Sequence, residues 1–541
     1  MPAGFESPHR RHRIGQALLL VACAVHPIHS QAQAYDGRLI DAVRITLERQ
    51  AAIAISRQEV SIAEGGLLSA KAAFDPVINA GVAWERTRTP LSEANPVSSP
   101  TPPFGPISTL SADSSQVEAG VTKKLRSGVT VNTALRVNQV VDNFASVNAP
   151  SQANVTLSFT LPLARGRGER VTTAYERAAQ LRRDALLQAS QHAVSSAVTA
   201  TVLAYWDVLA AQQTLEIVQA AEARAQSLLN DTRKLAAAQL VPQLDVRKFE
   251  SRLPSQAAQR IGAEQAVVRA RARLGLAMGL SPGETAAMPA PTDGFQLVEC
   301  CDGLTPGKLR DAVASLVAAA RQGRGDLLSV QNNLRASEAL LLAARDTHKP
   351  QLDLRIGVGY NGMTERSAGA STPSPLSALG SNVRGGNAFI GLNYVFPVNN
   401  QTARGLALQQ AAALEQVQLE KRALEDRVAS SVETGLGSVL GAAEQLRQAQ
   451  TAIRIQTEVY EGEKKKYLFG LSTLLDLFSN EAQLVANQLS LIETQLSLAS
   501  AMVQLRFETG TLLHPETEAQ TLDHTRLVRL PQTAGTPATA P

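Results

Sequence analysis

The 541-residue sequence predicts an α+β membrane protein, in which β-strands cross a bilayer and long helices continue from them. Three observations carry this prediction: the chain repeats itself, several segments alternate between apolar and polar residues, and two long segments are helical in composition and free of proline. With 18% charged and 44% hydrophobic residues, the chain is neither disordered nor uniformly apolar. The formal net charge of +4 is small, and basic residues are not clustered, so we expect no nucleic-acid partner.

The N-terminus has the features of an export signal. Arg10, Arg11 and Arg13 precede the apolar run "IGQALLLVACAV", and "AQA" at 32–34 suits signal-peptidase cleavage, so residues 1–34 are the predicted signal peptide. An alternative is a lipoprotein signal ending at an acylated Cys23 in "LVAC". Both interpretations export the chain. No later apolar stretch reaches about 18 residues, so we expect no membrane-spanning helix.

Two pairs of segments show that the chain is duplicated. "LSAKAAFDPVINAGV" (68–82) resembles "LAARDTHKPQLDLRI" (342–356), and "QLVPQLDVRKFESRL" (239–253) resembles "GLSTLLDLFSNEAQL" (470–484). Because the elements recur in the same order, we predict a tandem structural repeat. The predicted divisions are a first repeat over 35–280, a linker over 281–325, a second repeat over 326–510, and a disordered tail over 511–541.

Four segments alternate strictly enough to predict strands. In 154–161, apolar Val155, Leu157 and Phe159 are separated by Thr156, Ser158 and Thr160, so one face is apolar and the other polar. The other predicted strands are 74–84, 351–360 and 388–396. Their lengths approach what a tilted strand needs to cross a bilayer. A soluble sandwich remains open, but in an exported chain a barrel with lipid outside and water inside fits equally well.

A further candidate hairpin occupies 117–137, around "LRSG". Because it adds two strands, it preserves the direction in which the chain leaves the sheet. It either widens the barrel or lies outside it as an ornament.

The two long helical segments predict rods. Arg170–Gln239 and Ala403–Lys466 would each extend about 100 Å as α-helix. Leu424, Val428 and Val432 lie on one stripe, so the rod needs neighbouring helices, as in a coiled coil. The remaining helical segments, 39–71 and 473–508, are shorter. Two of them stacked end to end would match one rod and form a tube of helices.

A break interrupts each rod and predicts a helical hairpin. In "YLFGLSTLLDLFSNEAQL" (467–484), Gly470 suits a helix C-terminus, and Thr473 with Asp476 suits the start of the return helix. The first copy has Pro242, which is tolerated in a first helical turn. The predicted tips lie near 239–245 and 470–476. On this basis alone, Asp245 and Asp476 are capping residues.

The remaining chemistry-bearing residues predict no enzyme, no cofactor and no metal site. Cys300 and Cys301 are adjacent and lack spaced partners, and half of the eight histidines lie in the leader. No Ser/His/Asp or metal constellation is evident. "ARGRGER" (164–170) lacks the third glycine and the βαβ context of a dinucleotide site, so it is predicted to be a strand-to-helix elbow.

The ordered set of motifs resembles the TolC-like outer-membrane efflux protein family over Leu39–Gly510. The most specific elements are the duplicated layout, "G-L-S-x-L-L-D" at 470–476 and "LPLARGRGER" at 161–170. The resemblance implies a homotrimer with a transmembrane β-barrel and a periplasmic α-helical coiled-coil barrel. It also implies an exit duct of a tripartite efflux or type I secretion system, working with a periplasmic adaptor protein and an inner-membrane pump. The family usually has two strands per copy.

The resemblance also implies roles at the hairpin tips, which converge at the periplasmic aperture of the family. Asp476 and Tyr467 match aperture positions, and Asp245 is the counterpart of Asp476. Ser472 stands where an arginine lock can occur, and Ser479 where a second aspartate can, so the sequence departs from the family there. The residues expected at the tips, in contact with the adaptor, are Gly470, Leu471, Ser472, Leu240 and Pro242.

Two other classes of function remain open at this stage. An exported periplasmic coiled-coil scaffold without channel activity would have the same helices but no reason for strands with a lipid-compatible face. An exported hydrolase would need a catalytic constellation that the scattered histidines do not suggest.

Overall fold

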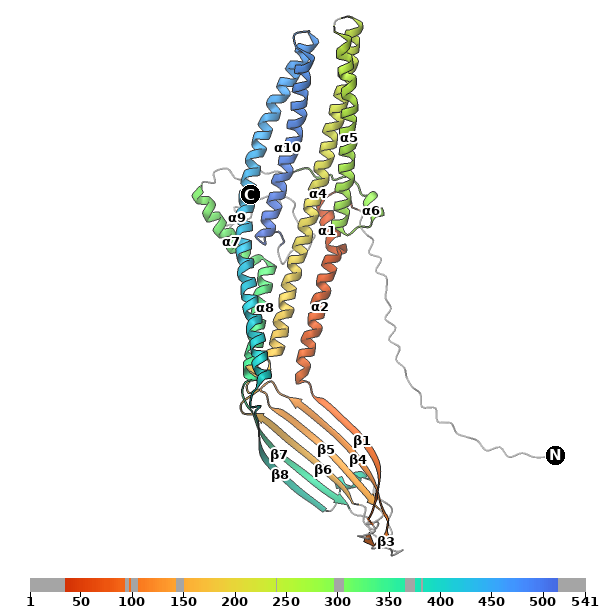
Figure 1. The fold of residues 1–541 in the computed structure, drawn as a ribbon, viewed down its shortest axis with the longest axis vertical. Helices are drawn as coiled ribbons and strands as arrows, with labels where there is room; N and C mark the ends of the chain where they lie inside the picture. The colour runs from red at the N-terminus through yellow and green to blue at the C-terminus, as the bar shows by residue number, and fades with distance from the viewer. Residues whose placement is uncertain are drawn as a thin grey trace, which may run out of the picture.

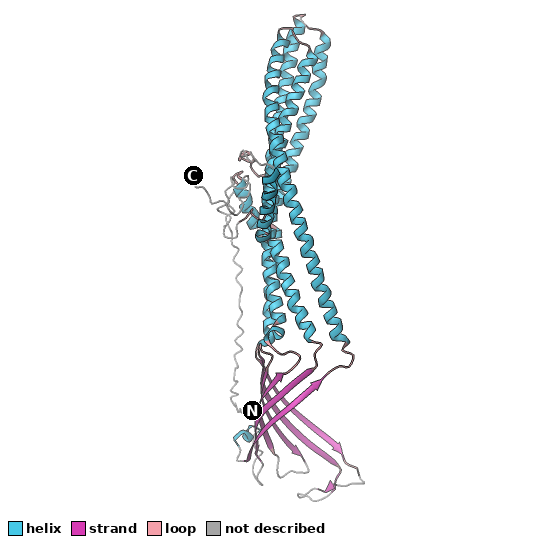
Figure 2. Ribbon diagram, turned by 90° about the vertical axis from the view of Figure 1, so that its left-hand side faces the viewer, coloured by secondary structure: helices cyan, strands magenta, loops and turns pink. Residues whose placement is uncertain are grey.

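The computed structural model describes residues 35–92, 97–98, 106–142, 150–239, 241–295, 306–364, 375–380 and 383–513. Within them, the molecule is elongated, with a β-sheet at one end and long helices continuing from it (Figures 1 and 2). The predicted signal peptide, Cys23, Leu240, Cys300, Cys301 and residues 514–541 of the predicted tail lie outside the described residues.

Six strands form one antiparallel sheet in the order β1-β4-β5-β6-β7-β8. They are β1 (Val77–Pro90), β4 (Thr109–Lys124), β5 (Thr130–Asp142), β6 (Ser151–Pro162), β7 (Gln351–Thr364) and β8 (Val383–Val395). Two short strands, β2 (Val97–Ser98) and β3 (Pro106–Ile107), pair separately. A 3-10 turn, η2 (Pro375–Gly380), packs on β6 and β7.

The strand bounds differ from the predicted ones mainly at the end away from the helices. The strand predicted over 74–84 spans Val77–Pro90, because Ala72–Phe74 forms a 3-10 turn (η1) that closes the preceding helix. The extension beyond residue 84 pairs with β4, and Arg86 Nε lies 2.6 Å from the Asp113 carboxylate across the two strands. That cross-strand pair stabilises strands whose apolar alternation has already ended.

The additional hairpin belongs to the sheet. Strands β4 and β5 lie between β1 and β6, so the alternative of an outer ornament was wrong. The register explains this placement, because Val117 and Val121 stand opposite Val82 and Ile78 of β1 and continue its apolar face. The first half of the chain therefore contributes four strands and the second half two.

The register also gathers the apolar residues on one face of all six strands. Val121 stands opposite Thr133, which stands opposite Leu157, which stands opposite Val358. Since alternate residues share a face, this row and those parallel to it define the apolar face. Its larger members are Ile78, Val82, Trp84, Val117, Val121, Leu135, Val155, Leu157, Phe159, Ile356, Val358, Tyr360, Ile390, Leu392 and Tyr394. The opposite, polar face carries mainly Asn, Thr, Ser and Gly.

Two uninterrupted helices run nearly the whole length of the helical part. They are α4 (Ala174–Ala237) and α9 (Gln401–Leu468), of 64 and 68 residues, or about 100 Å each. From their far ends, α5 (Gln243–Met278) and α10 (Leu474–Glu508) return about half way. The helices nearer the sheet are α1 (Leu39–Arg49), α2 (Ala51–Lys71), α3 (Glu169–Thr172) and α8 (Gly325–Asp346); α6 (Pro282–Ala286) and α7 (Pro306–Gly323) lie beside the middle.

The half-length helices stack end to end, as the helix lengths predicted (Figure 1). Helix α5 ends at Gly279, whose φ is +72°, and a Cβ there would lie 2.8 Å from the carbonyl oxygen of Arg49, next to the start of α2. Helix α10 ends beside Gly510, with φ +68°, where a Cβ would lie 2.6 Å from the carbonyl carbon of Gly323. Glycine is needed at both junctions for its backbone conformation and for the close approach.

The expectation of no sufficiently apolar helix was wrong. Helix α4 contains an 18-residue window of mean hydropathy 1.4, apolar enough by length and composition to cross a membrane. However, 56% of that window is buried inside the protein. Val198, Val202 and Tyr205 of α4 belong to a core with residues of α1 and α5, which accounts for apolar residues on more than one side of this helix.

Candidate functional site at the hairpin tips

The two hairpin tips reverse the chain with different residues at the same position. Gly470 follows α9 with a φ of +70°, and Gln239 follows α4 with a φ of +60°. Pro242 and Thr473 then serve as the N-cap residues of α5 and α10. Left-handed φ is favourable for glycine and costs a side-chain-bearing residue about 1 kcal/mol or more.

Asp476 lies in the first turn of α10 and takes part in the helix cap. The Thr473 hydroxyl accepts a hydrogen bond from the Asp476 N–H at 3.2 Å and donates one to the Asp476 carboxylate at 2.6 Å. The side chain is exposed. The negative charge is therefore held at the helix N-terminus, where the helix dipole stabilises it.

Asp245 occupies the corresponding place in α5 but has a cationic neighbour. Lys248 Nζ lies 3.0 Å from the Asp245 carboxylate, three residues along the same helix. The Asp245 N–H donates to the Pro242 carbonyl at 3.0 Å. The charge of Asp245 is thus partly offset within its own hairpin, which weakens the predicted acidic character of the tip.

Tyr467 and Ser472 make different kinds of contact. Tyr467 is buried, and its hydroxyl lies 3.4 Å from the Thr232 hydroxyl of α4, so it connects the two hairpins. The Ser472 hydroxyl donates to the Glu463 carboxylate within the second hairpin. That hydrogen bond, followed by the one from Lys466, lowers the pKa of Glu463. Of the predicted aperture residues, only Tyr467 bridges the hairpins, while Asp245 and Asp476 remain in separate ones.

A buried ion-pair cluster also connects the hairpins, through a residue that was not among the predicted site residues. Glu481 of α10 is 2% exposed and lies between two arginines, with Arg252 of α5 at 3.2 Å and Arg224 of α4 at 3.7 Å. Burial raises the pKa of the Glu481 carboxyl, and the two guanidinium groups oppose that shift. We call these three residues the Glu481 cluster.

Aromatic and aliphatic side chains surround the Glu481 cluster. The rings of Phe249 and Phe478 meet edge to face at 4.6 Å, and the Arg252 guanidinium lies 4.4 Å over Phe478. The buried residues of this core come from all four helices of the two hairpins: Leu228, Leu229, Ala236, Val246, Phe249, Tyr460, Tyr467, Leu474, Leu477 and Leu484. Because the low dielectric of such a core strengthens the attraction, the cluster fixes one hairpin against the other.

A signal for the Glu481 cluster does exist in the sequence. Arg224 lies about three and a half turns before the end of α4, Arg252 about two and a half turns into α5, and Glu481 about two turns into α10, so facing hairpins bring them to a similar level. The repeat counterpart of Glu481 is Glu250, which is partly exposed and pairs with Arg233 at 2.9 Å and Arg247 at 3.1 Å. The alignment of 239–253 with 470–484 makes Glu250 and Glu481 equivalent. In the structure, Glu481 is buried and Glu250 is partly exposed.

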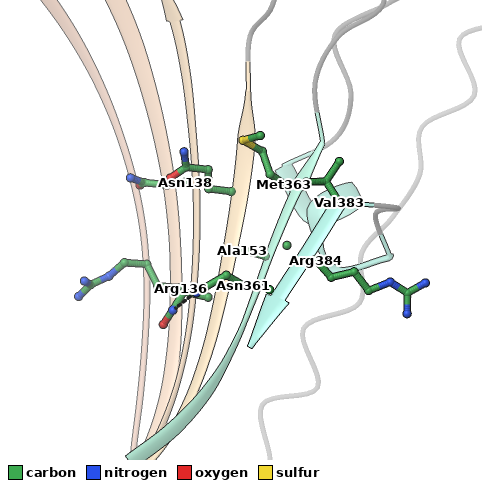
Figure 3. Close-up of a pocket in the computed structure, with 11 residues that line it drawn as sticks. Arg136, Asn138, Ala153, Asn361, Met363, Val383 and Arg384 are labelled. Carbon is green, nitrogen blue, oxygen red and sulfur yellow. Dashed lines mark hydrogen bonds between the residues drawn. The ribbon is translucent and has the colours of Figure 1, made fainter. Parts of the chain in front are cut away.

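The polar face of the sheet carries a second polar site, a cavity of about 570 Å³ across β5 to β8 (Figure 3). Arg136 lines it and pairs with Glu118 at 2.8 Å, and the Asn154 amide donates to Asn361 at 2.5 Å. Arg384 points away from Arg136 in Figure 3, because its register places it on the apolar face. Of the two arginines that line the cavity, Arg136 is paired with Glu118.

Within the described part of the chain, no three or more His, Cys, Asp and Glu side chains gather so as to hold a metal ion. The tips and the Glu481 cluster therefore provide hydrogen-bonding groups, ion pairs and exposed surface.

This combination of an amphipathic sheet and long helical rods is the fold of outer-membrane channels. The outer-membrane channel OprN is 14% identical, with a TM-score of 0.61 over 87% of this chain and 90% of the other. VceC of Vibrio cholerae is 16% identical, with a TM-score of 0.59 over 87% and 96%. The CmeC outer membrane channel of Campylobacter jejuni is 13% identical, with a TM-score of 0.60 over 98% of each chain. At these identities the likeness establishes the fold.

The family comparison covers part of the second half of the chain. Residues 316–511 match the family model described as outer membrane efflux protein. No curated protein sequence matches the chain. The family match, which covers about a third of the chain, and the fold confirm the predicted resemblance to the TolC-like outer-membrane efflux proteins.

Proposed function

We propose that this chain forms the exit duct of a tripartite efflux or type I secretion system, a passive conduit gated at its helical tips. The observation that carries the proposal is the six-stranded sheet, apolar on one face and polar on the other, joined directly to helical rods. A sheet with lipid on one side and water on the other requires this division.

The height of the apolar face agrees with a membrane barrel. Ten residues of β4 separate Asp113, which pairs with Arg86, from Lys123 at the helix side, and Val117 and Val121 lie between them on the same face. At about 3.3 Å per residue and a tilt of about 40°, this segment rises about 25 Å. That is the height of the apolar band of outer-membrane barrels.

The edges of the protomer support a closed ring. The outermost strands β1 and β8 are exposed throughout, and they continue into α2 and α9 at the two sides of the helical layer. Exposed apolar residues follow both sides: Ile55, Ile62, Leu68, Leu406, Leu408 and Leu419. Because the two sides differ, one protomer's β1 side would meet the next one's β8 side, a head-to-tail contact that closes into a ring. The resemblance implies three protomers, hence eighteen strands.

The tips are the proposed contact with a periplasmic adaptor, with an inner-membrane pump supplying the energy. Pro242 is exposed at the first tip, and Leu471 is exposed at the second, between Gly470 and Ser472; Leu240, outside the described residues, is proposed for the same contact. Asp476, Asp245 and Tyr467 are the proposed aperture residues. In this proposal, opening separates the hairpins that Tyr467 and the Glu481 cluster hold together.

Conductance in a planar lipid bilayer tests the proposal. We expect small, cation-preferring openings from the purified mature protein. In Asp476→Ala, conductance should rise and cation preference should fall, because the aperture loses charge. The matched control is Asp426→Ala, in an exposed position of α9 far from the tips. Unchanged channels in Asp476→Ala would restrict Asp476 to helix capping, and no insertion by a folded oligomer would contradict the duct itself.

The alternative remains an exported periplasmic scaffold. It predicts that carbonate or high salt alone extracts the protein from membranes. A sheet with an apolar face of bilayer height favours the duct, which requires detergent for extraction.

A further inference from the structure

A basic pocket lies where α2 joins the sheet. It has a volume of about 520 Å³ and is formed by the end of α2, the residues that lead from η1 to β1, the end of β4 and the β4–β5 turn. Lys71, Lys123, Lys124 and Arg126 line it, together with one acid, Asp75. Its lining therefore carries an excess of three positive charges.

The four cationic side chains differ in whether they are already paired or are available to bind a ligand. Arg126 is held by Glu176, at 2.8 Å, and by the ring of Phe74, with its guanidinium 5.0 Å from the ring centroid. Lys71, Lys123 and Lys124 are exposed and make no ion pair within 4.0 Å among the residues that the structure describes. The arginine shapes the wall of the pocket, and three ammonium groups remain available for an anion.

The pocket lies at the helix-side boundary of the apolar face. Lys123 follows Val121 by two residues on β4 and so lies on the same face, just beyond the last apolar residue of that strand. Exposed Leu68 and Leu125 also line the pocket. At the opposite boundary, Arg86 is paired with Asp113.

We propose that this pocket binds the phosphate headgroup of an anionic phospholipid in the leaflet nearest the helices, with the acyl chains along the apolar face. The proposal rests on the proposed membrane location. The excess positive charge of the pocket, its apolar contacts and the position of Lys123 at the boundary of the apolar face together favour a lipid over a free anion. Leu68 lies on the side that would meet the next protomer, so the lipid would also border the contact between protomers.

Native mass spectrometry of the detergent-purified, delipidated oligomer tests the site. The probes are phosphatidylglycerol and phosphatidylcholine at equal concentrations, with inorganic phosphate as a competitor. We expect preferential binding of phosphatidylglycerol, reduced about tenfold or more in Lys71→Gln/Lys123→Gln/Lys124→Gln, since each lysine contributes about fivefold near an anionic surface. The matched control is Lys464→Gln/Lys465→Gln/Lys466→Gln, with the same charge change at the far end of the rods.

Three outcomes would overturn the lipid site: equal binding of both lipids, equal phosphatidylglycerol binding by the pocket variant, or displacement by millimolar phosphate, which would indicate a free-anion site. Conductance of the same preparations in phosphatidylcholine bilayers tests the duct separately. Intact channels without a lipid preference would contradict only the lipid site, whereas selective lipid binding without channels would contradict only the duct.

Discussion

Glu481 is the residue on which the contact between the hairpins most depends. Its carboxylate lies between two guanidinium groups and is almost completely removed from water. A buried ion pair contributes little compared with an apolar replacement, but removing one partner leaves unpaired buried charge. Loss of a single member of the Glu481 cluster should therefore strongly destabilise the contact between the hairpins.

Glu481→Gln should lower the free energy of unfolding by about 3 kcal/mol, because Arg224 and Arg252 then repel each other without a counter-ion. Thermal unfolding of the oligomer in detergent measures this effect, and bilayer recordings should show longer openings. The matched control is Glu250→Gln, since Glu250 is partly exposed beside two arginines and its loss should cost much less than that of Glu481. Equal effects of the two substitutions would contradict a special role for Glu481.

Gln239→Gly should stabilise the first hairpin by about 1 kcal/mol, because it removes a side chain from a backbone with φ +60°. The reciprocal Gly470→Ala should destabilise the second hairpin by a similar amount. A Cβ on Gly470 would meet nothing within 4 Å, so its cost is conformational only. Hydrogen exchange of the tip amides measures both changes, and the same direction of change in both variants would refute the explanation.

Residues near the tips show what the sequence can predict at this scale. The Thr473–Asp476 cap was predictable, because it depends on two residues three positions apart in one helix. The burial of Glu481 was not predictable, because it depends on how three helices pack. The partly exposed Glu250 occupies the equivalent position in the first repeat.

Among the elements, β6 tests the division of the sheet into two faces. Leu157→Arg should cost about 2–4 kcal/mol of membrane-inserted stability, because Leu157 lies on the apolar face in a central strand. The adjacent Ser158→Arg, on the polar face, should be tolerated. Folding yield in liposomes measures both. Equal loss from the two substitutions would mean that the apolar face is not exposed to lipid.

The junction of α10 with α8 lies beside His192 of α4, a residue whose protonation should make stability depend on pH. His192 lies 3.8 Å from Asp326, with Arg324 and Glu508 in the same group, and its ring centroid lies 5.2 Å from that of Phe507 with the two rings tilted by 35°. Burial lowers the pKa of His192, so the folded protein binds fewer protons than the unfolded chain below about pH 6.5. Stability should therefore fall as pH decreases from about 6.5, by at most about 1.4 kcal/mol per pH unit.

His192→Gln should remove this decrease. Melting temperatures of the oligomer at pH 8 and pH 5.5 measure it, with His348→Gln as the matched control because the side chain of His348 is exposed. An unchanged pH profile in His192→Gln would exclude this histidine as its cause.

At the scale of elements, periodicity predicted the existence of the strands better than their extent. The segment 154–161 lies within β6, whereas β1 continues six residues beyond the predicted 84. Apolar alternation ends with the apolar face, but hydrogen bonding between strands does not require it and continues further. The pairing of the additional hairpin likewise depended on a register that the sequence alone did not define.

For the whole molecule, the difference between the β1 edge and the β8 edge predicts which strands meet between protomers. Ile78→Cys on β1, combined in turn with a cysteine at Ile390, Leu392 or Tyr394 of β8, should form disulfides between protomers in at least one pairing. The background carries Cys300→Ser and Cys301→Ser. Non-reducing gels should show species of up to three chains, and single-cysteine variants should not. Species of two chains only would indicate a closed dimer and contradict the ring.

The end-to-end junctions at Gly279 and Gly510 have a mechanical consequence. Helices α4 and α9 run without a break, whereas α5 and α2, and α10 and α8, meet end to end at the same level, where Arg324 also pairs with Glu508. A continuous helix transmits bending along its length, but a junction between two helices can pivot. In the proposed duct we expect the half-length helices to change direction at these junctions, while α4 and α9 keep the tips connected to the sheet. A pore built this way can open at one end and keep a constant seal with the membrane at the other.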